Sequence, residues 1–233
     1  MSITAPLAVS ASPAHALDCV APTVVLTEVG PTSLTVSPSE AEGFGVYVDI
    51  RSDGCTVSRV HARLTSPGGS ASEFDLEDAG GDGDLSYFAG GLEVDPAALL
   101  NTDAGTWSAQ IITESDGSPV TTVASLKVLR ASTLTLEALP DRVTKGRTLT
   151  VGGALARASW QPAAYGGYPQ QDVQLQFRPK GGTYKKVTTV VSRSRGVLKT
   201  TVAAAKDGCY RLVFGGSATT AKVTSRQECV DVR

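Results

Sequence analysis

Apolar residues in this sequence alternate with polar ones instead of recurring at the three- to four-residue spacing of a helix. The alternation recurs in Phe44 to Ile50, Val57 to Leu64, Val173 to Phe177, Val187 to Val191 and Cys209 to Phe214. Clusters of Gly, Pro, Asp and Ser interrupt it roughly every 8 to 12 residues, a pattern typical of antiparallel β-sandwiches. The 233 residues suit two domains of about 100 residues each.

Short turn motifs separate several of these runs. Four of them supply a residue that tolerates a positive φ: Ser52-Asp53-Gly54, Ser115-Asp116-Gly117, Lys180-Gly181-Gly182 and Arg195-Gly196. A short helical turn is indicated only at Pro96 to Leu100, with Asp95 as its N-cap and Pro96 as its first residue.

An acidic turn that runs into an aromatic residue occurs twice, roughly one domain length apart. The first copy is Asp103-Ala104-Gly105-Thr106-Trp107 and the second is Asp207-Gly208-Cys209-Tyr210. Both resemble the Asp-x-Gly-x-Tyr corner before strand F of immunoglobulin-like sandwiches, although one has Trp for Tyr and the other is one residue shorter. The resemblance implies an all-β chain of two tandem immunoglobulin-like antiparallel β-sandwiches.

Charge divides between the two halves. Residues 1–131 hold 5 Lys and Arg against 17 Asp and Glu, a net charge of −12, and residues 132–233 hold 16 against 6, a net charge of +10. We expect an acidic sandwich over 18–131 and a basic one over 132–233, joined at 129–132 by a linker too short to allow much motion. The split indicates either an interaction surface or two solvated surfaces that attract each other.

The first residues are small and mildly apolar. Ala14-His15-Ala16 resembles a signal-peptidase site, so 1–17 is predicted to be a signal or leader segment of a secreted, extracellular or cell-wall protein. A basic n-region is missing, which leaves a simple leader as the alternative. No stretch reaches the ~18 apolar residues of a membrane span, so none is expected.

Four cysteines divide evenly between the halves. Cys19 with Cys55 and Cys209 with Cys229 are expected to form disulfides, each stabilising the fold by ~3 to 4 kcal/mol. Metal binding would require closer spacing, such as Cys-x-x-Cys pairs. Cross-pairing between the halves stays open.

The second half carries a further resemblance. The runs Lys145–Gly153, Val173–Gly182, Asp207–Gly215 and Cys229–Val232 resemble the Ig-like repeats of secreted proteins from high-GC Gram-positive bacteria. The resemblance implies an adhesion, spacer or partner-binding module and says nothing of the ligand. The expected disulfides depart from the usual bridge between strands B and F.

Catalytic groupings are missing from the sequence. His15 falls in the predicted leader, so His61 is the remaining candidate base, and its strand-like context favours a surface or rim position. Gly-x-Ser-x-Gly, Ser-x-x-Lys and His-Glu-x-x-His are absent. We therefore expect no enzyme and no catalytic residue.

Six carboxylates surround a glycine-rich stretch: Glu73, Asp75, Glu77, Asp78, Asp82 and Asp84. Carboxylates on a flexible loop suit Ca²⁺, and Asp78, Asp82 and Asp84 are the candidate ligands of a weak site. The spacing matches neither an EF-hand nor a calcium-binding β-helix repeat, so a solvated acidic hairpin is the preferred interpretation. No other cofactor is expected.

Three large aromatic residues lie in the run from 159 to 169. Trp160, Tyr165 and Tyr168 are candidate binding residues on an exposed loop. The preferred alternative places Trp160 over the core and the tyrosines on the loop itself. Basic residues follow in the sequence and complete the candidate binding set: Arg178, Lys180, Lys185 and Lys186.

These observations favour a secreted, non-enzymatic binding or adaptor module for another secreted protein or an anionic envelope polymer. No motif supports nucleic acid as the partner. Two alternatives stay open, a Ca²⁺-dependent binder that uses residues 73–84 and a passive subunit or spacer of a larger secreted assembly.

Overall fold

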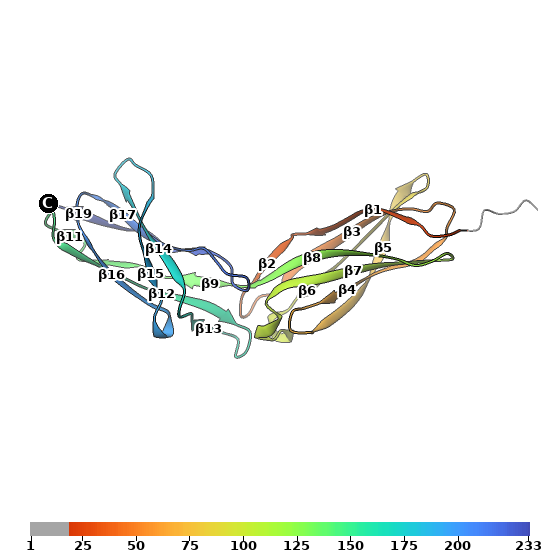
Figure 1. Cartoon of the computed structure of the whole chain (residues 1–233), viewed down its shortest axis with the longest axis horizontal. Coiled ribbons are helices and arrows are strands. Elements are labelled where there is room, and N and C mark those ends of the chain that lie inside the picture. Colours follow the sequence, from red (N-terminus) through yellow and green to blue (C-terminus); the bar gives the residue numbers. More distant parts are fainter. Residues whose placement is uncertain (1–18) are drawn as a thin grey trace, which may run out of the picture.

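The computed structural model describes residues 19–233, which form two β-sandwiches arranged end to end (Figure 1). The described residues contain no α-helix, only three single turns of 3-10 helix, so the predicted all-β sandwich fold is confirmed. No helix of this part of the chain is long and apolar enough to cross a bilayer. The predicted leader lies outside the described residues and stays a prediction.

The N-terminal sandwich contains eight strands in the order β1-β3-β6-β5-β4-β7-β8-β2. Strand β5 belongs to both layers, because its first half pairs with β4 and its second half with β6. The strands are β1 (Thr23–Gly30), β2 (Ser33–Val36), β3 (Glu42–Arg51), β4 (Val57–Thr65), β5 (Ala71–Asp82), β6 (Leu85–Val94), β7 (Gly105–Ser115) and β8 (Val120–Arg130).

The C-terminal sandwich is built around one long strand, β12. Its first part pairs with β10 and β16, and its last part with β9 and β13. The facing sheet has the order β11-β19-β17-β14-β15, with β18 on β17. The strands are β9 (Ser132–Leu134), β10 (Glu137–Leu139), β11 (Arg142–Val143), β12 (Thr148–Ser159), β13 (Ala164–Gly167), β14 (Asp172–Pro179), β15 (Lys185–Val191), β16 (Val197–Ala203), β17 (Gly208–Phe214), β18 (Val223–Thr224) and β19 (Glu228–Val232).

The alternation of the sequence places one face of each strand in a core. On β3, Phe44, Val46, Val48 and Ile50 are buried while Tyr47 points outward. Each sandwich encloses its own apolar cluster. The outward positions are therefore available for charged and polar groups.

Most turns have the predicted backbone. Asp53 and Gly54 have φ of 49° and 80°, and Arg195 and Gly196 have 58° and 75°. Gly117 differs, since its φ is not positive. There a Cβ would lie 2.4 Å from Sγ of Cys19, so glycine is required for a close approach.

The predicted helical turn exists as a single 3-10 turn. It spans Pro96–Ala98, and the Asp95 carboxylate accepts a hydrogen bond from the Ala97 amide at 2.9 Å. The N-cap identified in the sequence is thus confirmed, and it directly follows β6.

The two acidic corners behave differently. In the first, the Trp107 indole donates to the Asp103 carbonyl at 2.7 Å, and the buried Asp103 carboxylate accepts from Ser66 and Leu100. In the second, Tyr210 is buried but Asp207 is exposed and accepts from the Val232 amide at 2.8 Å. The shorter corner therefore holds the last strand, β19, instead of burying its carboxylate.

Both predicted disulfides are present. Cys19–Cys55 ties the segment before β1 to the β3–β4 turn, and Cys209–Cys229 joins directly opposed residues of β17 and β19. No described cysteine is free.

Trp160 joins the two sandwiches. Although it follows β12, it is 3% exposed and belongs to the apolar core of the N-terminal sandwich. Its indole donates to the Val36 carbonyl at 3.4 Å, and its amide donates to Asn101 Oδ1 at 3.0 Å. The connection itself is only Ala131, whose amide also donates to the Val36 carbonyl. The junction is therefore packed and hydrogen-bonded.

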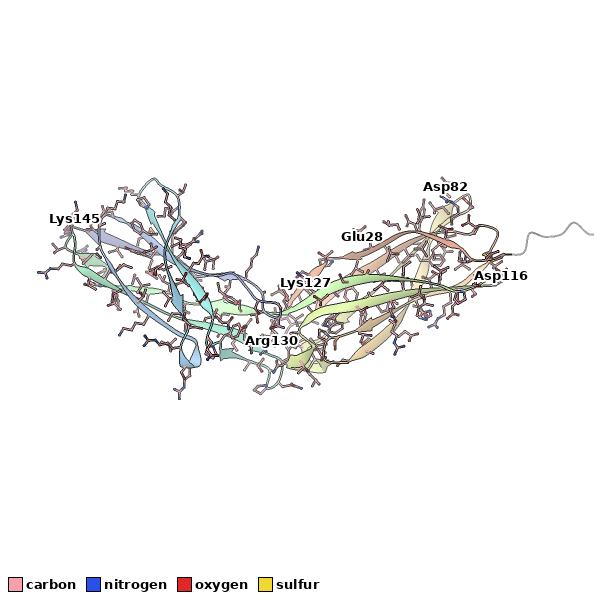
Figure 2. All side chains as sticks on the ribbon, viewed as in Figure 1. Glu28, Asp82, Asp116, Lys127, Arg130 and Lys145 are labelled. Carbon is pink, nitrogen blue, oxygen red and sulfur yellow. A yellow bond between two sulfur atoms is a disulfide. The ribbon has the colours of Figure 1, made fainter. Side chains whose placement is uncertain are left out.

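Arg130 carries a buried charge at this junction (Figure 2). Its Nε donates to the Ala158 carbonyl, and its backbone pairs with residues 219–221. Burial, and then the nearby charge of Arg157, lower the pKa of Arg130 to about 10. The charged form of Arg130 is therefore less stable in the folded protein than in water.

Replacing Trp160 by Ala should destabilise the N-terminal sandwich, although the residue belongs to the other half of the chain. The lost ring leaves a cavity that lowers the free energy of unfolding by about 3 kcal/mol, and it frees the two halves to move. Denaturant unfolding and small-angle X-ray scattering measure the two effects. Tyr165→Ala, an exposed residue nearby, is the control, and equal effects of both variants would contradict this role.

The buried Arg130 predicts a dependence of stability on alkaline pH. Because its pKa in the fold is lowered to about 10, well below its ordinary value, above about pH 10 the folded protein releases the proton while the unfolded chain keeps it. The free energy of unfolding of wild type relative to Arg130→Met should be constant below about pH 10 and should then rise by up to about 1.4 kcal/mol per pH unit. Urea unfolding between about pH 8 and pH 11 tests this. A constant difference throughout would contradict it.

Candidate binding site

The basic residues identified in the sequence lie around the β14–β15 hairpin, whose turn is formed by residues 180–184. Arg178 and Lys180 lie on one side and Lys185 and Lys186 on the other. Two grooves flank this hairpin and share Pro179 and Gly182 in their walls. The structure thus brings four of the predicted binding residues into one region.

The larger groove has a volume of about 650 Å³. Its wall includes Arg142, Arg178 and Lys180 together with three aspartates and the Cys209–Cys229 disulfide. Asp231 lies 4.0 Å from Arg142, and Asp207 accepts the Val232 amide. This groove is of mixed charge.

The smaller groove has a volume of about 340 Å³ and is more uniform in charge. Lys185, Lys186 and Lys206 line it with Phe177 and Thr183, and no carboxylate is among its lining residues. Three ammonium groups beside a hydroxyl favour an anion such as a carboxylate or a phosphate.

A tyrosine held between two arginines lies next to the grooves. The guanidinium carbon of Arg211 is 3.9 Å from the centroid of the Tyr184 ring, and that of Arg178 is 5.0 Å from it. Gln227 Oε1 accepts from Arg178 at 3.0 Å and from the Tyr184 hydroxyl at 2.7 Å, while Arg211 donates to Gln176 at 2.8 Å. We call these five residues the Tyr184 cluster.

Apart from Arg142, which lies near Asp231, the cations around the two grooves and Tyr184 have no carboxylate partner in the described chain. Within residues 19–233, no carboxylate lies within 4.0 Å of Arg178, Arg211 or any lysine of the smaller groove. The aromatic face and the amide oxygens orient the two guanidinium groups without neutralising them. The arrangement is suited to an anion supplied from outside.

Two predicted binding residues are not exposed. Trp160 is buried in the junction, and Tyr168 is 9% exposed in the C-terminal core, where Arg157 lies 4.1 Å from its ring centroid. These two candidates therefore do not form an exposed binding loop, because apolar packing and a stacked guanidinium cover them. The preferred interpretation, in which Trp160 lies over a core, agrees with its burial. Tyr165 is 45% exposed on β13, away from the grooves.

Several members of the site were missed by sequence reasoning. Tyr184, Lys206, Arg211 and Gln227 come from the β14–β15 hairpin, the loop after β16, β17 and the segment before β19. The register pairs Arg211 with Gln176 and Gln176 with Lys186. These residues lie together because their strands pair in this register. Their spacing along the chain does not predict this proximity.

His61 lies on the outer face of the central strand β4 but is buried, so its expected surface or rim position is wrong. Its Nε2 is 3.5 Å from Glu73 and its Nδ1 is 3.7 Å from Glu114. Arg59 covers the same carboxylates and donates to Asp75, a hydrogen bond that raises the pKa of Arg59. The imidazole thus lies against the ion pairs that Arg59 forms with these carboxylates.

The acidic hairpin keeps its carboxylates apart. Asp78 accepts the Gly80 amide at 2.8 Å, and Asp84 lies 3.6 Å from Arg51. Asp82 ends β5 and is exposed. Among the described residues, these three do not form a group whose oxygens converge on one point, as a calcium site requires.

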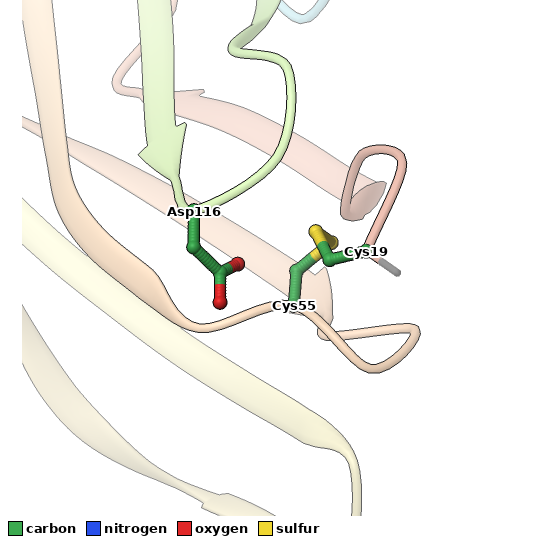
Figure 3. Close-up of side chains that lie close together, drawn as sticks. All are labelled: Cys19, Cys55 and Asp116. Carbon is green, nitrogen blue, oxygen red and sulfur yellow. A yellow bond between two sulfur atoms is a disulfide. The ribbon is translucent and has the colours of Figure 1, made fainter. Parts of the chain in front are cut away.

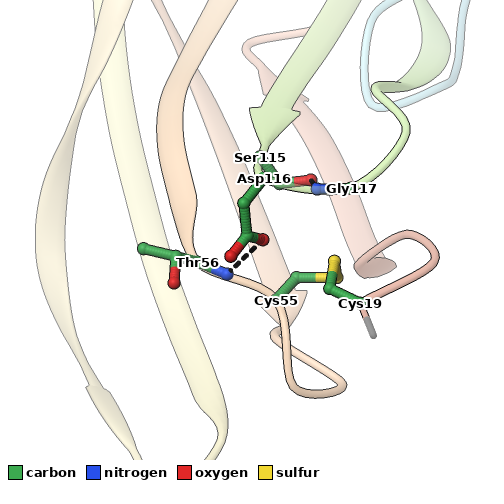
Figure 4. Close-up of a disulfide and its surroundings, with 6 residues drawn as sticks. All are labelled: Cys19, Cys55, Thr56, Ser115, Asp116 and Gly117. Carbon is green, nitrogen blue, oxygen red and sulfur yellow. Dashed lines mark hydrogen bonds between the residues drawn. A yellow bond between two sulfur atoms is a disulfide. The ribbon is translucent and has the colours of Figure 1, made fainter. Parts of the chain in front are cut away.

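One group of possible ligands does converge, at the far end of the N-terminal sandwich (Figure 3). It consists of Cys19, Cys55 and Asp116, but both sulfurs are used in the disulfide. The Asp116 carboxylate accepts the Thr56 amide at 2.8 Å, beside the disulfide (Figure 4). The disulfide and this hydrogen bond therefore stabilise this end of the sandwich and leave no sulfur for a metal ion.

Three solved structures to which this chain is similar match it with TM-scores of 0.46 or lower. Murine CEACAM1b is 12% identical, with a TM-score of 0.42 over 91% of this chain and 100% of its own. Two fibronectin type-III domains of chicken tenascin are 14% identical, with a TM-score of 0.36 over 88% and 96%. A DUF4785 family protein from Legionella pneumophila is 14% identical, with a TM-score of 0.46 over 84% of this chain, which spans 54% of its length.

No family model matches the sequence. No curated protein matches it either. The function of the site therefore depends on its own residues.

Calcium at about 1 mM should leave the melting temperature unchanged, because Asp78 and Asp84 already have partners and a bound ion would have to displace them. Thermal unfolding with calcium and with a chelator measures this, and magnesium is the control ion. A calcium-specific rise in melting temperature that Asp78→Asn removes would contradict the prediction.

Proposed function

We propose that this protein is a secreted, non-enzymatic binding or adaptor module that holds an anionic partner at the β14–β15 hairpin. The supporting observation is the set of cations around the two grooves and Tyr184 that have no carboxylate partner in the described chain. A folded protein that keeps such groups unpaired on a rigid sheet has a preformed anion-binding surface. Another secreted protein and an anionic envelope polymer are the candidate partners.

Secretion is part of the proposal. Two disulfides favour an oxidising compartment, in agreement with the predicted leader. The resemblance of the second half to Ig-like repeats of secreted proteins from high-GC Gram-positive bacteria agrees with a role at the cell envelope. We treat 18–131 and 132–233 as its two domains.

A non-enzymatic role is supported by the surroundings of His61. The groups beside its ring nitrogens are the carboxylates of Glu73 and Glu114, and its cross-strand partners are Asp75 and Ile112. A rigid spacer is the second candidate function, and the packed junction at Trp160 favours it.

Binding of polyphosphate and polyglutamate tests the proposal. Replacing Lys185, Lys186 and Lys206 together by Ala should weaken binding about tenfold, since exposed charge pairs contribute about 0.5 kcal/mol each. Titration calorimetry measures the affinity.

Lys199→Ala, an exposed lysine on β16, is the matched control and should bind as the wild type does. Equal binding by the triple variant, or binding of neither polyanion by the wild type, would refute a basic binding site.

A further inference from the structure

The N-terminal sandwich has an outer face that opposes the basic site in charge. The outward residues of β1, β3, β6 and β5 form one row in register: Glu28, Tyr47, Ala89 and Glu77. The neighbouring rows add Asp49 beside Tyr87 and Gly43 beside Glu93. We call this surface the acidic face.

Its carboxylates are unpaired. Within residues 19–233, no cation lies within 4.0 Å of Glu28, Asp49, Glu77 or Glu93. Apolar groups are exposed among them, since Leu26 is 44% exposed and Tyr47 is 50% exposed. Charge and apolar area together on one sheet face are features of a docking surface.

The acidic face is also flat. Gly30, Gly45 and Gly91 form a row across β1, β3 and β6 and contribute no side chains of their own. The Tyr47 ring lies over Gly45, where an added Cβ would be 2.9 Å from the tyrosine hydroxyl. A flat aromatic surface can lie against another sheet face.

The C-terminal sandwich presents a counterpart, which we call the basic face. Lys186, Gln176 and Arg211 form a row across β15, β14 and β17, and Arg178 lies in the next row beside Tyr184. Val187 and Val191 of β15 are 46% and 55% exposed. This face likewise combines unpaired charges, a tyrosine and apolar side chains.

The spacings of the two rows are compatible. Lys186 and Arg211 lie two strand spacings apart, roughly 10 Å, and Glu28 and Glu77 lie three apart, roughly 14 Å. Lysine and arginine side chains are long enough to span the difference. Cations could therefore meet carboxylates while the tyrosines pack between them.

We propose that the acidic face of one molecule binds the basic face of a second copy, so that the protein associates head to tail. This inference rests on the proposed function, since it names the anionic partner of the basic site. Trp160 fixes the sandwiches end to end, so the two faces of one molecule cannot meet. An anionic envelope polymer would bind only the basic face. A second copy of the protein would bind both the basic face and the acidic face. The contact joins two different surfaces, so it continues into a chain unless it closes into a ring.

Two variants that each remove one face test the proposal. Glu28→Gln with Glu77→Gln neutralises the acidic face, and Arg178→Gln with Arg211→Gln neutralises the basic face. In sedimentation or light scattering at low salt, the mass of the wild type should rise with concentration above the monomer mass of 24.0 kDa. It should return to that mass at about 1 M salt, where charges are screened within about 3 Å.

Each variant alone should remain a monomer. A 1:1 mixture of the two should form dimers and nothing larger, because each contributes one intact face. Glu137→Gln with Arg147→Gln, at exposed positions outside both faces, is the control and should associate as the wild type does. Circular dichroism of each variant establishes that it is folded.

A wild type that stays monomeric at every concentration, or a mixture that stays monomeric, would overturn the inference. If that wild type still binds polyphosphate through its lysines, the proposed function stands and a polymer is the partner. If it binds no polyanion either, both proposals fail.

Discussion

Burial of one indole ring, that of Trp160, determines how every surface of this protein is placed. Trp160 follows a strand of the C-terminal sandwich, but its ring is buried in the core of the N-terminal sandwich. Burial of the ring is favourable because it removes apolar surface from water, and the indole N–H also donates a hydrogen bond to the Val36 carbonyl. Because the connection between the sandwiches is only Ala131, this contact leaves the joint little freedom. The acidic and basic faces therefore keep one fixed orientation, and a partner meets preformed surfaces.

Few charged side chains are buried inside the two sandwiches, so most charged side chains lie on the outer faces. The alternation on β3 and β14 fills the cores, and the buried Asp103 carboxylate is satisfied by Ser66 and Leu100. Arg130 is the exception, a buried cation whose pKa falls to about 10. Its hydrogen bond to Ala158 ties the last strand of one sandwich to β12 of the other. This hydrogen bond supports the orientation of the joint, although the burial of the charge is itself unfavourable.

Much of the fold could be predicted from the sequence, because the relevant signals are local. Alternation on β3, the N-cap at Asp95 and the turn at Asp53-Gly54 depend on neighbouring residues, and both disulfides join cysteines of one half. The site was predicted in part. Arg178, Lys180, Lys185 and Lys186 do gather at one hairpin, but Arg211 and Tyr184 meet through strand register. Trp160 was expected over a core, but the sequence did not indicate that this core belongs to the neighbouring sandwich, because that contact depends on how the two domains are joined.

Segregation of charge across a stiff joint also has a physical consequence for how the molecule moves. With −12 on residues 1–131 and +10 on residues 132–233, and with the two sandwiches arranged end to end (Figure 1), the protein has a large permanent electric dipole. A charged surface or a similar molecule exerts a torque on such a dipole before any contact forms, and this torque weakens as salt shortens the range of the field. Because the Trp160 contact holds the two sandwiches in one orientation, the whole molecule turns as a single body in such a field.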